Sequence, residues 1–131
     1  MLGPLLDLIH AVRYETAVPR LYVELVICRI AQLEGSDYEL AHHLPMAATA
    51  GATGEQLDRL EQWREAECFD DAERAVLAYA EHMAAAAPRD DAGLEAHFGP
   101  AEQTELTVAG SAYLAIARIL RALDVKPDPG L

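Results

Sequence analysis

The sequence contains few cysteines. Cys28 and Cys68 are the only two, far apart in the chain and each in an apolar context. Two isolated thiols do not form the disulfide framework of a small secreted domain, so they indicate a reducing compartment. A dithiol peroxidase also needs a reactive thiolate with a resolving thiol close by. We therefore expect both cysteines to be small buried side chains, and the sequence argues against thiol peroxidase activity.

Basic residues are also scarce. The chain has 10 Lys and Arg residues against 22 Asp and Glu residues, which gives a formal net charge of −12. No cluster of basic residues stands out, so nucleic acid and anionic membrane surfaces are poor partners. An anionic small-molecule substrate would have to be held by local arginines against the overall negative field.

Long hydrophobic runs are absent. The longest uncharged apolar stretch near the C-terminus spans residues 106–117, shorter than the roughly 20 residues of a membrane-spanning helix. The first residues lack the basic region and the small-residue cleavage site of a signal peptide. We expect a cytoplasmic protein with no membrane partner.

The residues that are abundant favour helices. Hydrophobic residues make up 52% of the chain, with many Ala and Leu, whereas aromatic residues make up only 6%. No alternating β-type run of useful length is present. The predicted fold is all-α, a bundle of about six to seven helices in a single domain over residues 1–131, with a frayed tail at residues 126–131.

Apolar periodicity and capping signals predict where these helices lie. Pro19 suits the first turn of a helix that stops at Gly35, and Pro45 should kink the next helix. Capping-box patterns begin at Ser36, Thr53 and Asp70. The expected helices span residues 2–13, 19–34, 36–51, 53–63, 70–87, 91–98 and 100–123.

Two of these helices, over residues 19–34 and 100–123, are apolar on nearly all faces. A helix buried on every side is unusual in so small a domain. We therefore predict that another subunit covers part of their surface, and that the protein is a homo-oligomer.

Glu24, Glu39 and His43 are the residues best suited to chemistry. Glu24 projects from an apolar helical stripe, where an unpaired carboxylate is costly and takes up a proton or finds a donor. Glu39 and His43 are four residues apart, so they share one helix face, and a carboxylate beside an imidazole suits general acid or base catalysis. Structural alternatives remain: an Arg partner for Glu24, a capping role for Glu39, and a core position for His43.

Other chemistries find little support. His42 points about 100° away from His43 on a helix, so the two histidines cannot chelate one ion together. Glu24, Glu39 and His43 lack the spacing of a known three-ligand motif, and we expect no metal. Ser36 and Ser111 are the only serines, and neither has the context of a nucleophile elbow.

The segment of residues 23–43 resembles the carboxymuconolactone decarboxylase and alkylhydroperoxidase-D-like family. The peroxidase branch of that family carries a Glu, then Cys-x-x-Cys, then a His four residues later. Here Glu24 and His43 stand at the Glu and His positions, while Ser36 and Glu39 stand at the two cysteine positions. Most of the remaining chain is similar as well, so the sequence looks like a branch that lacks the dithiol. Val23 is a departure, because many relatives have a basic residue there.

The resemblance implies a small all-α, AhpD-like protein that assembles as a homotrimer or homohexamer and needs no cofactor. It implies an acid/base lyase, similar to 4-carboxymuconolactone decarboxylase, that acts on a small carboxylated or lactone substrate. In this hypothesis His43 delivers a proton, Glu39 orients His43, and Glu24 positions it or, if protonated, binds substrate. The candidate substrate-binding residues are Tyr38, His42, Arg29 and Arg118.

Two other functions remain open at this point. The same fold could serve as a catalytically silent oligomeric binding or scaffold protein, because a fold does not imply a function. A redox role through Cys28 or Cys68 is a weaker alternative, since neither thiol has a partner nearby in the sequence.

Overall fold

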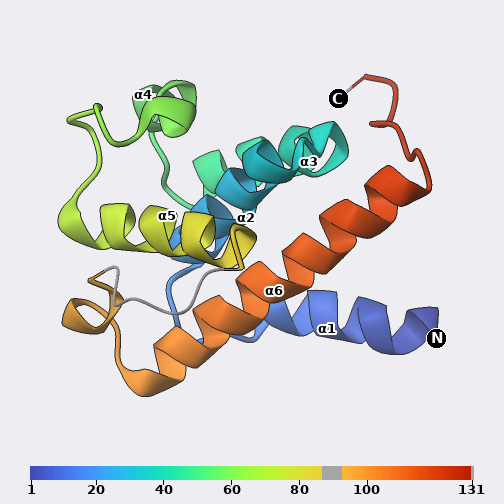
Figure 1. Cartoon of the computed structure of the whole chain (residues 1–131), viewed down its shortest axis with the longest axis horizontal. Helices are drawn as coiled ribbons and strands as arrows, with labels where there is room; N and C mark the ends of the chain where they lie inside the picture. The colour runs from blue at the N-terminus through green and yellow to red at the C-terminus, as the bar shows by residue number, and fades with distance from the viewer. Residues whose placement is uncertain (87–92, 131) are drawn as a thin grey trace.

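A computed structural model describes residues 1–86 and 93–130. This part of the chain contains helices and no strand, which confirms the all-α prediction (Figure 1). The α-helices are α1 (Leu2–Tyr14), α2 (Arg20–Glu34), α3 (Asp37–Thr49), α4 (Gly54–Asp58), α5 (Asp71–Ala84) and α6 (Pro100–Ala122), and two short 3₁₀ helices are η1 (Leu60–Gln62) and η2 (Leu94–Ala96). Within the same residues, no helix is both long and apolar enough to cross a membrane.

Helix α2 is the centre of the molecule. Helices α3, α5 and α6 pack around it, and every residue from 23 to 31 is buried within the single chain (Figure 1). The chain's own helices thus bury the middle of α2, while Leu33 near its end is 41% exposed, so coverage of part of this helix by a partner subunit stays a prediction. On helix α6, Val108 and Ile119 are likewise each more than 40% exposed.

The chain reverses sharply between α2 and α3. Gly35 has a φ of 66°, the left-handed conformation that glycine adopts without steric cost. Ser36 then caps α3, and its hydroxyl accepts a hydrogen bond from the Glu39 amide at 3.5 Å. Helix α3 continues through Pro45 and ends at Thr49, two residues before the predicted end. This tight connection sets α3 directly against α2.

Two of the expected helices differ most from the prediction. The Thr53 capping box does start α4, but the α-helix ends at Asp58 and the chain continues as η1 instead of reaching residue 63. There the chain turns to bury Leu60 and Trp63. The helix expected over residues 91–98 begins outside the described residues. The described part of this segment contains only η2, and both Leu94 within η2 and Phe98 after it are buried.

Helix α1 packs mainly against α6, and a carboxylate holds the loop that follows it (Figure 1). Glu105 on α6 accepts hydrogen bonds from the backbone amides of Ala17 at 3.0 Å and Val18 at 2.9 Å. This contact fixes the end of α1 relative to the start of α2. The C-terminal tail is exposed, but Asp128 lies 3.5 Å from His42, so the tail turns back toward α3.

Candidate active site

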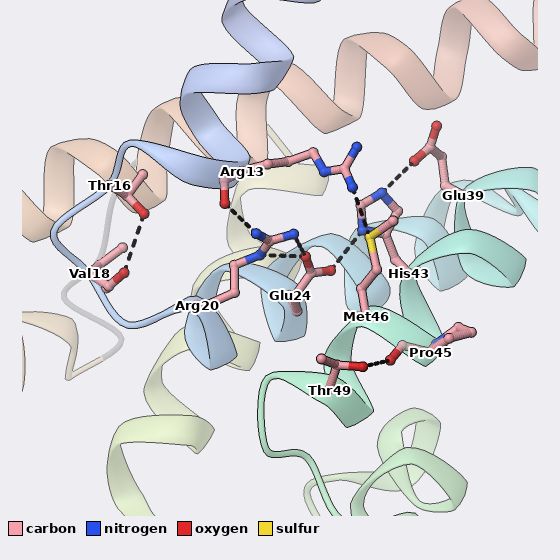
Figure 2. A network of polar contacts seen from close by, with 10 residues as sticks. All are labelled: Arg13, Thr16, Val18, Arg20, Glu24, Glu39, His43, Pro45, Met46 and Thr49. Atoms are coloured by element: carbon pink, nitrogen blue, oxygen red, sulfur yellow. Dashed lines mark hydrogen bonds and ion pairs between the residues drawn. The ribbon is translucent and has the colours of Figure 1, made fainter.

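His43 lies between two carboxylates at the place where α2 and α3 pack together. Its Nδ1 is 2.7 Å from Glu24 Oε2, and its Nε2 is 3.2 Å from Glu39 Oε2 (Figure 2). All three side chains are buried, and Glu24 has no exposed surface at all. The structure thus brings the three predicted catalytic residues into one row of contacts.

Glu24 is the anchored end of this row. Arg20, one helical turn earlier, donates from Nε to Glu24 Oε1 at 2.7 Å, and its guanidinium also donates to the Arg13 carbonyl (Figure 2). Burial alone would raise the pKa of Glu24, but the hydrogen bonds and charges of His43 and Arg20 hold that pKa below its usual value. The contacts and the lowered pKa favour the ionised form, which supports a positioning role for Glu24 over substrate binding in protonated form.

The two carboxylates also set the charge of His43. Burial favours the neutral ring, yet the hydrogen bonds and negative charges of Glu24 and Glu39 raise the pKa of His43 above its usual value of 6.5. An imidazolium donates from both nitrogens, which matches a carboxylate on each side. The His43 imidazole is consequently a proton donor that lies between two carboxylate acceptors.

Glu39 faces His43 and does not close a capping box. The Ser36 amide, which a capping Glu39 would accept from, donates instead to the carbonyl of Ala31 at 2.9 Å. The Glu39 side chain is left for the imidazole one turn further along α3, as expected for residues four apart. The alternative in which Glu39 only caps the helix is therefore excluded.

A pocket of about 240 Å³ opens beside His43 and Glu39. The Tyr113 ring meets the His43 ring edge to face, with 4.9 Å between the centroids. Burial and the nearby Glu39 raise the pKa of Tyr113, so its phenol keeps its proton and can act as a hydrogen-bond donor. The full lining is Ile9, Arg13, Tyr38, Glu39, His42, His43, Met46, Tyr113 and Ile116.

The predicted substrate-binding residues separate into two groups. Tyr38 and His42 line the pocket, and their rings are 4.5 Å apart. Arg29 instead binds Glu81 at 2.9 Å and links α2 to α5, while Arg118 is exposed and binds Glu34 at 3.2 Å. Neither arginine lines the pocket, because each is held by a carboxylate elsewhere.

Arg13 and Tyr113 are pocket residues that the sequence analysis did not single out. Arg13 lies in the last turn of α1, and nothing in its local sequence separates it from any other arginine in such a position. Tyr113 lies within the apolar stretch of α6, where a core position is the simplest expectation. Both share a pocket with His43 because α1 and α6 pack beside α3.

Neither cysteine belongs to this pocket. Cys28 is fully buried on α2, and burial together with the charge of Glu24 raises the pKa of its thiol. Cys68 is half-buried, less than predicted. The carboxylates of Glu24 and Glu39 contact opposite nitrogens of one imidazole, so they do not point at a common metal position. Residues 1–86 and 93–130 contain no group of three or more His, Cys, Asp or Glu side chains arranged to hold a metal ion.

Comparisons with known proteins agree with this fold. Residues 4–82, which include all three residues of the row, match the model of the carboxymuconolactone decarboxylase family. A solved structure from Agrobacterium tumefaciens, a protein of unknown function suggested to be the antioxidant defence protein AhpD, superposes with a TM-score of 0.88. That alignment covers 97% of this chain and 90% of the other at 22% sequence identity, so it bears on the fold alone. A search of curated protein sequences finds no match.

Proposed function

Because the chain belongs to the carboxymuconolactone decarboxylase family, we propose that it is a cofactor-independent acid/base enzyme. Its substrate is a small carboxylated or lactone-type acid, and its reaction is a decarboxylation or a related lyase or isomerase step. The observation that carries this proposal is the imidazole of His43, held between Glu24 and Glu39 on the wall of a pocket. A proton donor held in this way is what such a reaction requires.

The contacts suggest a separate role for each residue. Glu24, ionised and bound to Arg20, orients the imidazole through Nδ1, as a carboxylate does for a catalytic histidine. Glu39 contacts Nε2 and lines the pocket, so it is the end of the row that meets a substrate. Our earlier assignment, in which Glu39 orients His43, is replaced by this one.

The proposed reaction uses the proton on the His43 imidazole. When the bond to a carboxylate carbon breaks, CO₂ leaves and the electron pair remains on the substrate as an enolate. His43 supplies a proton from Nε2 to the carbanionic carbon, with Glu39 as the relay, and the imidazole is then reprotonated from water. A positioned proton donor of this kind accounts for roughly 10²–10⁴-fold in rate.

The redox alternative has less support. The Agrobacterium relative is suggested to be an antioxidant protein, but here Ser36 and Glu39 stand at the positions of the family's two cysteines. The Cys28 thiol is fully buried and lies away from the pocket. Thiol titration tests the redox alternative, because rapid reaction of Cys28 in the native protein would support it.

We further propose that the protein assembles as a homotrimer or homohexamer. Large apolar side chains on α1 and at the end of α6 are exposed in the single chain, among them Leu2 at 69%, Leu6 at 61% and Leu123 at 71%. A monomer of this size rarely leaves so many leucines in water without a partner.

The decisive experiment for the enzymatic proposal is a turnover assay on γ-carboxymuconolactone, followed by ultraviolet absorbance and CO₂ release. We expect His43→Gln and Glu39→Gln to lower kcat by about 10²–10⁴-fold, because each removes a member of the proton path. Arg59→Gln, a change at an exposed residue outside the pocket, should leave kcat unchanged.

Full activity in His43→Gln would refute the assigned role of this residue. No turnover of this lactone or of related enolisable acids by the wild type would favour the silent binding or scaffold protein instead.

A further inference from the structure

Arg13 is a charged side chain on the pocket wall with no carboxylate partner in residues 1–86 and 93–130. Its Nη2 is 3.2 Å from the sulfur of Met46, a weak acceptor, and its Nε is buried with no hydrogen-bond partner among the described residues (Figure 2). The neighbouring Arg20 is paired with Glu24, and Arg29 is paired with Glu81. Buried donors are normally satisfied, so this guanidinium lacks an acceptor that a ligand could supply.

Arg13 lies where two cavities meet. The inner pocket of about 240 Å³ contains His43 and Glu39, and an outer groove of about 650 Å³ runs between the end of α1 and the second half of α3. Arg13, His42 and Met46 line both cavities. A ligand bound at Arg13 therefore has access to the catalytic row on one side and to the groove on the other.

The outer groove suits an apolar group. Ala41, Pro45, Met46 and Ala50 contribute apolar surface, and Tyr14 contributes a ring that Arg13 and Arg20 cover from 5.0 and 5.1 Å. Among the residues that the structure describes, no carboxylate lines the groove, although the chain carries 22 acidic residues. Local positive charge beside apolar walls is complementary to a carboxylic acid that has a hydrophobic portion.

We propose that Arg13 binds the substrate carboxylate and that the outer groove holds an apolar substituent of the same substrate. The substrate class is then carboxylic acids with an apolar group too large for the inner pocket, and not only compact lactone acids. This inference deepens the proposed function, since it names what the catalytic row acts on. Arg13 takes the anchoring role that the sequence suggested for Arg29 and Arg118.

Calorimetric titration with butanoate, hexanoate and octanoate, and with 1-octanol as the uncharged control, tests the inference directly. Each methylene buried in the groove should tighten binding about fourfold, so octanoate, with four more methylenes, should bind on the order of 10² times more tightly than butanoate. Arg13→Met, which removes the guanidinium and keeps an unbranched apolar side chain, should weaken octanoate at least tenfold and leave 1-octanol unchanged. Arg13→Lys should recover part of the loss.

Ala50→Phe distinguishes the groove from the inner pocket. It narrows only the groove, so it should abolish the advantage of octanoate while leaving butanoate binding intact. Ala48→Phe, on the same helix but outside the groove lining, and Arg59→Met are the matched controls and should behave as wild type. Thermal unfolding of each variant verifies that it is folded.

The outcomes separate this inference from the proposed function. A wild type that binds acids in this pattern but turns none over contradicts only the enzymatic proposal. Octanoate affinity unchanged in both Arg13→Met and Arg13→Lys would overturn the inference. Equal binding of butanoate and octanoate by the wild type, or an Ala50→Phe variant with an intact chain-length dependence, would overturn it as well.

Discussion

At the scale of single residues, the stability of the protein is linked to the titration of His43. Its pKa is raised in the folded state, so its contribution is complete below about pH 6.5 and is lost as pH rises through the higher folded-state pKa. Glu24 acts in the opposite sense: its pKa is lowered, so its contribution is present above about pH 4.5 and is lost as pH falls through the lower value. The cluster therefore stabilises the fold most between these two limits.

We predict that the difference in unfolding free energy between wild type and His43→Gln decreases as pH rises above 6.5. Urea unfolding at intervals from pH 5 to pH 9 measures this difference, and the exposed His97→Gln variant is the matched control. NMR titration of the imidazole should place the pKa of His43 above 6.5 in the folded protein. A stability difference that grows with pH would contradict the arrangement of His43 between two ionised carboxylates.

At the scale of secondary-structure elements, the position of α1 depends on Glu105. Its two oxygens accept from the amides of Ala17 and Val18, and hydrogen bonds to a charged acceptor contribute about 1.5–3 kcal/mol each. Helix α1 carries Arg13, so this contact on α6 holds the proposed substrate anchor in place. The arrangement connects a loop far from His43 in the sequence to the shape of the pocket.

We expect Glu105→Gln to loosen α1 without unfolding the core, because the amide group can accept only one of the two hydrogen bonds. Hydrogen exchange should become faster over residues 2–18 while α2 remains protected. Glu102→Gln, which makes the same change on α6 at the carboxylate that accepts from the Gly99 amide, should leave the exchange of α1 unchanged. Equal exchange of α1 in the Glu105→Gln variant and the wild type would show that apolar packing alone holds this helix.

At the scale of the whole molecule, charge and exposed apolar surface act in opposite directions on assembly. Each chain carries a net charge of −12, so copies repel one another, whereas the exposed leucines of α1 favour contact. Salt screens the repulsion and leaves apolar contacts in place.

We predict a mass of three or six times 14.3 kDa by light scattering at micromolar concentration, with tighter association at higher salt. Leu6→Asp should shift the mass toward the monomer, and Ala48→Asp, which adds the same charge on α3, should not. A monomer mass for the wild type at every salt concentration would refute the proposed assembly.

Much of the fold was predictable from short-range signals. The proline before α2, Gly35 after it, and the caps at Ser36, Thr53 and Asp70 mark helix ends through local hydrogen bonding and backbone geometry. These effects act over a few residues, so the sequence displays them directly. The early ends of α4 and η2 could not be predicted, because they depend on which apolar side chains the rest of the chain buries.

The sequence by itself determined the helical class, the missing dithiol and the shared face of Glu39 and His43, since four-residue spacing on a helix is a local property. Only the tertiary structure decided that Glu24, 19 positions earlier, meets the other nitrogen of His43. It also decided that Arg13 lies at the pocket while Arg29 and Arg118 bind other carboxylates. The physical reason is that helix packing sets distances between residues far apart in the chain, and packing depends on burial summed over the whole molecule.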